Sequence, residues 1–354
     1  MRTLTSDLVK QFGRSRGLDL VGVASIERFK NAPPRMHPAA IMPHARSVIV
    51  VARRILRGNW RGMEEGVYWP NYTHFGYHGL LNSYLIPMPL YDLACWIEDH
   101  GWEAVPYYPG VPERQPPAEP LRPGAVAPDV HLAIRIAGVA AGLGEIGWSK
   151  VFMTRRFGPR VRLHAIFTDA ALTPDPLMEP GTLCDRCMAC VKGCTPGAIP
   201  HVHDGDTVKI QIEDKIYEWG DVHMGRCTLG FHGGDPMLSP FIHKSLPGYT
   251  CRVAEQGISE NNAYKMCWPM SLDPWPPTQE DPSGYRIEGH AMLRKWGGDG
   301  SFAVGGSRGC MRSCFDHMEQ KGACEQTFVN GRFIKRKRWL LPDTVPSEQQ
   351  PGEP

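Results

Sequence analysis

The feature that most constrains this chain is a run of four closely spaced cysteines. Cys184, Cys187, Cys190 and Cys194 follow the spacing C-x2-C-x2-C-x3-C, and Pro196 stands shortly after the last of them. This spacing is typical of loops that wrap an iron–sulfur cubane, and in two-cluster proteins the fourth cysteine ligates the other cluster. We therefore look for further cysteines, distant in the sequence, that complete the ligand set.

The composition favours metal binding over disulfides. The chain has 354 residues and eleven cysteines, an odd number that does not fit a disulfide framework. Hydrophobic residues make up 42% and charged residues 21%, as in soluble globular proteins. The formal net charge of +2 gives no reason to expect nucleic acid as a partner. The sequence contains no membrane-spanning apolar run and opens with no secretion signal, so we expect a cytoplasmic protein.

A second set of cysteines lies downstream. Cys310 and Cys314 have the x3 spacing that ends such a run, but Ser307 stands where the preceding cysteine would be. A crossed, ferredoxin-like arrangement predicts that the first cluster takes Cys184, Cys187, Cys190 and Cys314. The second would take Cys194, Cys227, Cys310 and one more residue, which stays open among Cys251, Cys267, Cys324 and Ser307. A single cluster with unused downstream cysteines is the alternative.

Before the cysteine run, strand patterns alternate with helix patterns. Leu4, Leu8 and Phe12 recur at four-residue spacing, which predicts a helix over residues 4–16 that stops at Gly17. The β-branched run 47–52 predicts the clearest strand. Further strands are expected at 18–24, 104–108, 162–168 and 208–212, and further helices at 80–100 and 131–141. This alternation predicts an α/β layer before residue 170.

Residues 57–79 carry many aromatic rings and glycines without a helical or strand period. We expect an irregular segment whose rings line a pocket.

Several short motifs then occur in a fixed order. Ala141-Gly-Leu-Gly-Glu-Ile-Gly147 is followed by Phe157-Gly-Pro-Arg-Val-Arg-Leu163, by Thr168-Asp-Ala-Ala-Leu172 and by the cysteine run. In this series, over about residues 5–200, the chain resembles the corrinoid-dependent reductive dehalogenases. It is also similar to their relatives, the epoxyqueuosine reductases.

The resemblance implies an α/β (α+β) fold with a nitroreductase-like cobalamin-binding core and a ferredoxin-like module that carries two [4Fe-4S] clusters. We expect the core at residues 1–172 and the module at 173–330, with a long insertion at about 228–305. Residues 331–354 would form a basic, disordered tail. Base-off cobalamin, reduced by the nearer cluster, would remove halogen from an organohalide while a tyrosine gives the proton. An external low-potential donor of the ferredoxin or flavodoxin type would supply the electrons.

The resemblance also directs attention to individual residues. Tyr72 and Tyr77 are the preferred proton donors, ahead of Tyr107 and Tyr108, because they lie in the aromatic segment. Arg135 is expected either to steady the tyrosinate or to reach the surface. The predicted cofactor-binding residues are Gly142, Gly144, Gly147, Arg160 and Arg162. A plain tight turn is the alternative for the three glycines.

Two other functions stay open. One is deoxygenation of a tRNA base in the manner of the epoxyqueuosine reductases, in which Asp129 would be the acid. The other is a non-catalytic ferredoxin-type electron carrier, which would need neither cobalamin nor an apolar pocket. The long segment before the cysteines argues against the carrier. The substrate, the electron donor and the oligomeric state do not follow from the sequence.

Overall fold

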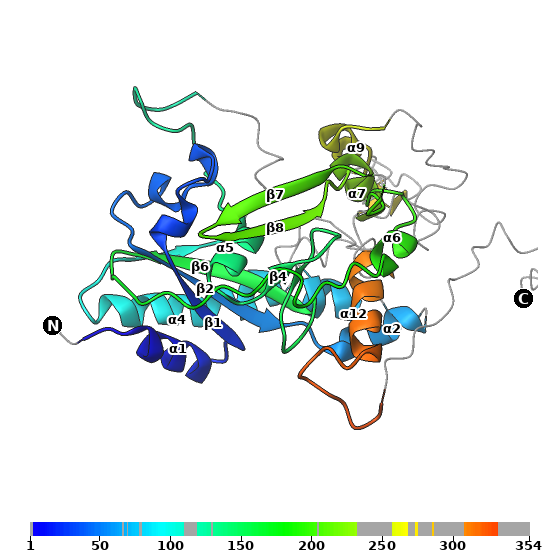
Figure 1. Ribbon diagram of the computed structural model, residues 1–354, viewed down its shortest axis with the longest axis horizontal. Helices are drawn as coiled ribbons and strands as arrows, with labels where there is room; N and C mark the ends of the chain where they lie inside the picture. Colours follow the sequence, from blue (N-terminus) through cyan, green and yellow to red (C-terminus); the bar gives the residue numbers. More distant parts are fainter. Residues whose placement is uncertain are drawn as a thin grey trace, which may run out of the picture.

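The computed structural model describes residues 3–65, 67–68, 70–77, 80–109, 119–128, 130–203, 205–231, 257–267, 273–274, 285–286 and 308–331 (Figure 1). The helices are α1 (Ser6–Ser15), α2 (Arg61–Glu64), α3 (Pro70–Tyr72), α4 (Pro87–Glu98), α5 (Ile134–Ala140), α6 (Ala189–Gly193), α7 (Met224–Phe231), α9 (Glu260–Cys267) and α12 (Cys310–Gln320). The strands are β1 (Leu20–Ser25), β2 (Ser47–Arg54), β3 (Ala104–Tyr107), β4 (Glu145–Ile146), β5 (Phe152–Met153), β6 (Val161–Thr168), β7 (Thr207–Ile212), β8 (Lys215–Gly220), β9 (Asp273–Pro274) and β10 (Tyr285–Arg286).

The centre of the fold is a four-stranded sheet in the order β1-β2-β6-β3. Every neighbouring pair is antiparallel, with Val21 opposite Val51 and Ile49 opposite Ile166. An antiparallel sheet contains no βαβ crossover, because that unit joins parallel strands. The fold is therefore α+β, and the expected α/β alternation is wrong for this layer.

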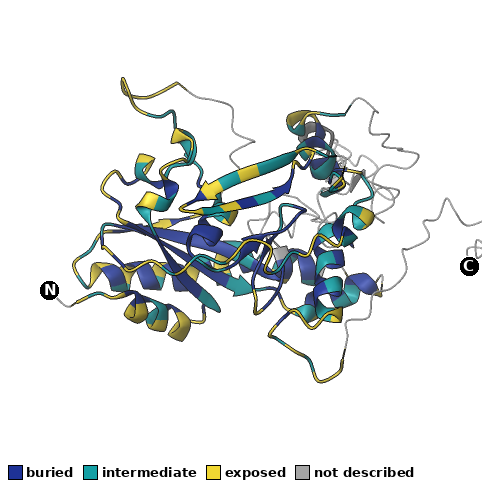
Figure 2. Cartoon of the chain, viewed as in Figure 1, coloured by how far each residue is buried: buried dark blue, intermediate teal, exposed yellow. Residues whose placement is uncertain are grey.

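The strands of the sheet are largely buried (Figure 2). Their side chains alternate between two faces, as the pleat requires. One face packs against α1 and α4 through residues such as Val23, Ile49 and Ile166. The other face packs against α5 and the β7–β8 hairpin through residues such as Val50 and Phe167. Helices on one side and a helix with a hairpin on the other thus cover both faces of the sheet.

Most of the predicted elements are confirmed. Helix α1 is capped by Thr5, whose hydroxyl accepts from the backbone N–H of Leu8, and the chain turns at Gly17 with φ +95°. Strands β1, β2, β3, β6 and β7 and helices α4 and α5 all fall within the predicted ranges or within a few residues of them. The pattern analysis missed strand β8, which completes a hairpin with β7.

The aromatic segment is more helical than predicted. Among the described residues from 57 to 77 the chain forms a series of short helical turns, one of them π-helical at Thr73–Tyr77. Trp60 and Tyr72 from this segment pack at a ring distance of 4.9 Å inside the core. Burial of these rings holds the turns without a regular sequence period.

A buried ion pair joins α12 to the aromatic segment. Arg312 on α12 donates through two nitrogens to the carboxylate of Glu64 on α2, and both side chains are almost fully buried. Arg308 donates to the backbone oxygen of Met63 at 3.2 Å. The C-terminal helix is therefore held against the core by contacts that span most of the sequence.

The boundary at residue 172 between the core and the iron–sulfur module stays a prediction. Most of the insertion predicted at about 228–305 and all of the predicted tail except Gly331 lie outside the described residues. No helix in the described part of the chain is long and apolar enough to cross a bilayer.

Candidate functional site

Four of the predicted cysteines line one small cavity. We call these four the outer thiol group: Cys184, Cys187, Cys190 and Cys314. The first three come from the cysteine run and the fourth from α12. Cys187 is exposed to solvent, whereas Cys190 is buried. The structure therefore places together the four sulfurs that the crossed arrangement assigns to the first cluster.

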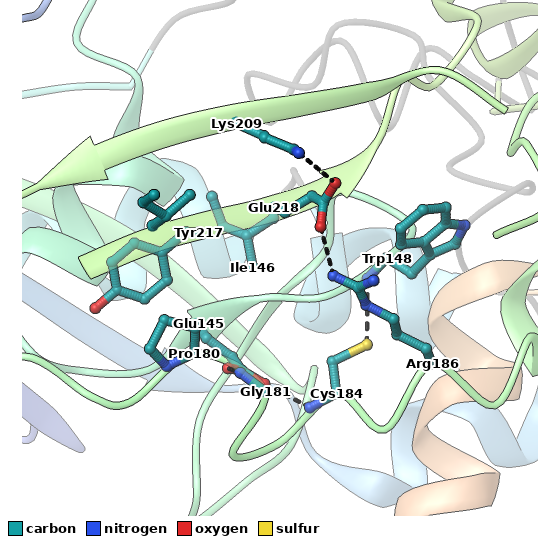
Figure 3. Close-up of a pocket in the computed structure, with 11 residues that line it drawn as sticks. Glu145, Ile146, Trp148, Pro180, Gly181, Cys184, Arg186, Lys209, Tyr217 and Glu218 are labelled. Carbon is teal, nitrogen blue, oxygen red and sulfur yellow. Dashed lines mark hydrogen bonds and ion pairs between the residues drawn. The ribbon is translucent and has the colours of Figure 1, made fainter.

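The backbone of the cysteine run is curled by two left-handed residues. Arg186 has φ +52° and Met188 has φ +58°, so the chain reverses between successive cysteines. The carboxylate of Glu145 fixes the start of the run, because it accepts from the N–H groups of Gly181 and Leu183 at 2.8 and 2.7 Å and from that of Cys184 (Figure 3).

Three further cysteines line a second cavity and form what we call the inner thiol group: Cys194, Cys227 and Cys310. Cys194 ends the cysteine run, Cys227 lies on α7 and Cys310 begins α12. The backbone N–H of Ala198 donates to the sulfur of Cys194 at 3.2 Å. These are the three thiols assigned to the second cluster.

Helix α12 links the two groups. Cys310 and Cys314 are four residues apart, about one helical turn or ~6 Å along the axis, yet they line different cavities. Helix α6 lies close beside α12, since a Cβ atom on Gly193 would come within 2.3 Å of the Ser313 hydroxyl. The close approach of the two helices thus brings the cysteine run against both cysteines of α12.

The structure narrows the choice for the fourth inner ligand. Cys324 packs with Met153 and Met318 beside the outer group, and it does not line the inner cavity. Ser307, Cys251 and the side chain of Cys267 lie outside the described residues. The fourth ligand therefore stays open among these three.

The chemistry of the thiols fits iron–sulfur clusters. All the described cysteines are free. Burial, followed by the neighbouring thiols, raises the pKa of both Cys190 and Cys227 to about 11. The same two causes hold the pKa of Cys310 and Cys314 far above the ordinary value. Buried, crowded thiols of this kind are stabilised when a metal displaces their protons.

The inner cavity also reaches the predicted proton donor. Its volume is about 220 Å³, and Tyr72, Arg135 and Arg162 line it together with the three thiols. Tyr72 is 1% exposed, and its hydroxyl lies 3.5 Å from the sulfur of Met311. Burial raises the pKa of the Tyr72 phenol to about 12, although the Arg162 cation beside it acts in the opposite direction. The phenol therefore keeps its proton at neutral pH.

Of the three predicted arginines, Arg135 and Arg162 line the inner cavity and Arg160 does not. Arg162 lies on β6, donates to the backbone oxygen of Gly76 at 3.3 Å and hydrogen-bonds with Tyr72. Arg135 is exposed on α5, with its side chain at the cavity. Arg160 does not line the cavity: it donates to the oxygens of Ile55 and Gln326 at 2.8 and 2.7 Å and its guanidinium lies over an aromatic ring of α12.

The other tyrosine candidates are not brought to this cavity. Tyr107 faces the opposite side of the sheet and packs on Phe167 at a ring distance of 5.4 Å. Tyr108 is half exposed, with its hydroxyl 3.2 Å from that of Ser83. The side chain of Tyr77 and the whole of Asp129 lie outside the described residues.

The predicted glycines pack against protein. A Cβ atom on Gly142 would come within 2.3 Å of the backbone oxygen of Pro176, and one on Gly144 within 1.8 Å of that of Met153. Gly147 lies beside Met153 and the sulfur of Cys184. A tight turn accounts for Gly142 and Gly144, and their approach to a corrin stays a prediction.

Two functional candidates were missed in the sequence. Lys150 lines the inner cavity, and Glu145 holds the cysteine run as described above. Glu145 lies within the glycine motif and Lys150 three residues after it, so their position in and beside that motif was the available signal. A third cavity, of about 390 Å³, lies between the β7–β8 hairpin and the sulfur of Cys184 (Figure 3).

Part of the chain is similar in sequence to curated proteins. A tetrachloroethene reductive dehalogenase from Dehalobacter restrictus is 38% identical over 88 residues, which are 24% of this chain and 15% of that protein. Another from Sulfurospirillum multivorans is 35% identical over 78 residues, 21% of this chain and 16% of that protein. Over these stretches the chain is similar to the reductive dehalogenases. The matched stretches cover less than a fifth of these dehalogenases.

No family model matches the chain. Among solved structures, a catabolic reductive dehalogenase aligns with a TM-score of 0.45 and 17% identity, covering 81% of this chain and 36% of that one. An epoxyqueuosine reductase with a tRNA stem loop aligns with a TM-score of 0.46 and 15% identity, covering 90% of this chain and 82% of that one. Scores this low establish neither a shared fold nor a shared function.

Proposed function

We propose that the protein is a cobalamin-dependent iron–sulfur oxidoreductase that removes halogen from an organohalide. The observation that carries this proposal is the inner cavity, where a protonated, buried phenol and three partly buried thiols line the same space. A carbon–halogen bond is replaced by a carbon–hydrogen bond when two electrons and one proton are delivered together, and the halide leaves. A cluster held by the thiols would supply the electrons, and the phenol beside it would supply the proton.

The two thiol groups would form a path for the electrons. Cys187 gives the outer group an exposed edge, where an external low-potential donor of the ferredoxin or flavodoxin type would deliver electrons. Cys190 of the outer group is close enough to Cys310 of the inner group to raise the pKa of the Cys310 thiol. Two [4Fe-4S] clusters held by these thiols would therefore lie next to each other, with the inner one at the cavity.

A corrinoid bound base-off would lie against the inner cavity, and most of its bulk would extend beyond the volume of about 220 Å³ that the described lining encloses. The described residues that line the cavity include no histidine to ligate cobalt, and Val151, Ile199 and Phe231 contribute apolar surface. When bound, the corrinoid supplies the strongly reducing metal centre that carbon–halogen cleavage needs. The protein holds the substrate in an apolar site and excludes water from it.

The proton and the leaving halide would be handled by polar side chains of the cavity. Tyr72 holds its proton because burial disfavours the phenolate, and Arg162 fixes the direction of the hydroxyl by a hydrogen bond. Arg135 and Lys150 add positive charge to the cavity wall, which stabilises a departing halide. The chain would thus act as acid and electrostatic support for the bound cofactor.

The test begins with the metal content. The chain is expressed with cobalamin, purified without oxygen, and assayed for iron and cobalt per chain and for halide release from aryl and alkenyl halides. We expect about eight irons, as two cubane clusters require, together with cobalt and released halide. Iron without cobalt would favour the simple electron carrier. Both metals without halide release, but with turnover of an epoxyqueuosine-modified tRNA stem loop, would favour the tRNA-base reaction.

A further inference from the structure

One turn of the chain reaches both thiol groups. It joins β4 to β5 and comprises residues 145–153. The backbone N–H of Trp148 donates to the sulfur of Cys184 at 3.3 Å, and the Ser149 hydroxyl donates to that of Cys190. Lys150, the next residue, lines the inner cavity. The turn therefore lies between the two predicted clusters.

The first residue of the turn, Glu145, places a buried carboxylate beside the outer thiol group. Glu145 is 2% exposed, and its carboxylate accepts from three backbone N–H groups at the start of the cysteine run. Figure 3 shows the bonds from Gly181 and Cys184. No described cation forms an ion pair with it. Burial raises the pKa of the Cys184 thiol, and the Glu145 carboxylate adds to that rise.

The other charges near the outer group are paired with one another. Asp185 hydrogen-bonds with Lys321 and with His317. Arg186 is paired with Glu218 at 2.8 Å. These pairs are partly exposed, so solvent screens them. Glu145 is therefore the charge near Cys184 that neither an ion pair nor solvent offsets.

Near the inner group, most of the charged side chains among the described lining residues are positive. Lys150 extends to within 3.9 Å of the sulfur of Met224, one turn before Cys227 on α7. Arg135 lines the same cavity, and the one carboxylate among the described lining residues, Glu260, accepts a hydrogen bond from Thr228. At Cys227 the two cations counteract the effect of burial on the thiol pKa.

We propose that this turn directs the electrons inward: Glu145 lowers the reduction potential of the outer cluster, and Lys150 raises that of the inner one. A fixed negative charge disfavours an added electron nearby, and a fixed positive charge favours it. An electron on the outer cluster then moves downhill to the inner cluster, one at a time and without breaking a bond. The inference rests on the proposed function only in assuming two clusters.

The test is a redox titration of the anaerobic protein, followed by electron paramagnetic resonance. The Cys314→Ser and Cys227→Ser variants assign the two signals to the outer and the inner cluster. We expect Glu145→Gln to raise the outer potential and leave the inner one in place. We expect Lys150→Met to lower the inner potential, whereas Lys150→Arg, which keeps the charge, leaves it unchanged. Glu218→Gln, which removes a screened carboxylate, serves as the control for the outer cluster.

The Glu145 variant tests the outer cluster and the Lys150 variants test the inner cluster, so either result is informative without the other. Loss of the outer cluster in Glu145→Gln would leave the Lys150 variants to decide, because the contacts of Lys150 described above lie at the inner cavity. Unmoved potentials in iron-loaded Glu145→Gln and Lys150→Met, or equal shifts of both clusters in either variant, would overturn the proposal. Because the titration needs neither cobalamin nor an organohalide, that outcome would leave the proposed function standing, whereas a chain without iron would remove both.

Discussion

At the scale of single residues, Tyr72 is the side chain on which the proposed chemistry most depends. It is the one described tyrosine that lines the inner cavity, and Arg162 is its hydrogen-bond partner there. A phenol in this setting resists ionisation, so its proton is available only to a strongly basic centre that forms beside it. This property suits protonation of a carbon atom that has just lost halide.

Tyr72→Phe removes the proton and keeps the ring. We expect the rate of halide release to fall by about 10²- to 10⁴-fold, the usual contribution of a general acid, with iron and cobalt contents unchanged. Tyr217→Phe is the matched control, since it removes a hydroxyl that donates to the backbone of Met178 away from this cavity. A Tyr72→Phe variant with full turnover would show that another group gives the proton.

The pH dependence follows from the same residue. Because the pKa of Tyr72 is raised to about 12, the acid stays protonated throughout the neutral and mildly alkaline range. The turnover rate should therefore show no loss of this acid between about pH 7 and pH 9, as measured in a steady-state pH profile with a chemical reductant. A falling limb in that range that disappears in Tyr72→Phe would contradict the assignment.

At the scale of elements, α12 is the helix that joins the core to both thiol groups. Its N-terminal half carries Cys310, Arg312 and Cys314, so one short helix makes the core contact and supplies a sulfur to each group. The Glu64–Arg312 pair constrains where this helix lies, since the two buried charges neutralise each other. Their position therefore determines how accurately the sulfurs are placed.

Glu64→Gln leaves the Arg312 cation buried without its counter-charge. We expect a loss of about 3 to 5 kcal/mol in the free energy of unfolding, as is usual when one partner of a buried pair is removed, measured by anaerobic urea denaturation. Asp92→Asn, which breaks the exposed pair with Arg16, should cost less than about 1 kcal/mol. Equal effects of the two substitutions would mean that the buried pair does not hold α12.

The sequence predicts regular elements better than it predicts the contacts between them. Strands such as β2 and β6 follow from β-branched, apolar runs, and the cysteine spacing led to the grouping of sulfurs that the structure displays. The Glu145 contacts with the cysteine run and the Glu64–Arg312 pair were not foreseen, because they join positions 36 to 39 and 248 residues apart. Nothing local in a sequence marks a carboxylate that will be buried by a distant segment.

At the scale of the whole molecule, the cysteine-bearing segments depend on one another for their packing. The cysteine run, α7 and α12 meet around the two thiol groups, and Met188, Cys190 and Ile199 form a small core of their own. Bound clusters would connect these segments by metal–sulfur bonds. Stability of this part should therefore include the free energy of metal binding.

Removal of iron should lower the thermal stability of the protein. A chelator under reducing conditions is expected to lower the melting temperature and to increase amide hydrogen exchange in residues 184–199 and 310–320, while the central sheet stays protected. Hydrogen exchange followed by mass spectrometry measures both regions in one experiment. Unchanged exchange in the two cysteine-bearing segments would argue against a structural role for iron there.

Helix α12 also bears on how the protein matures. Because Cys310 and Cys314 lie on one rigid turn, a metal centre that fixes either sulfur also positions the other for its own group. If both proposed clusters bind, occupancy of one site would increase the affinity of its neighbour, and the effect would be reciprocal. Under iron scarcity, the population would divide into fully assembled and empty chains, with few half-filled ones.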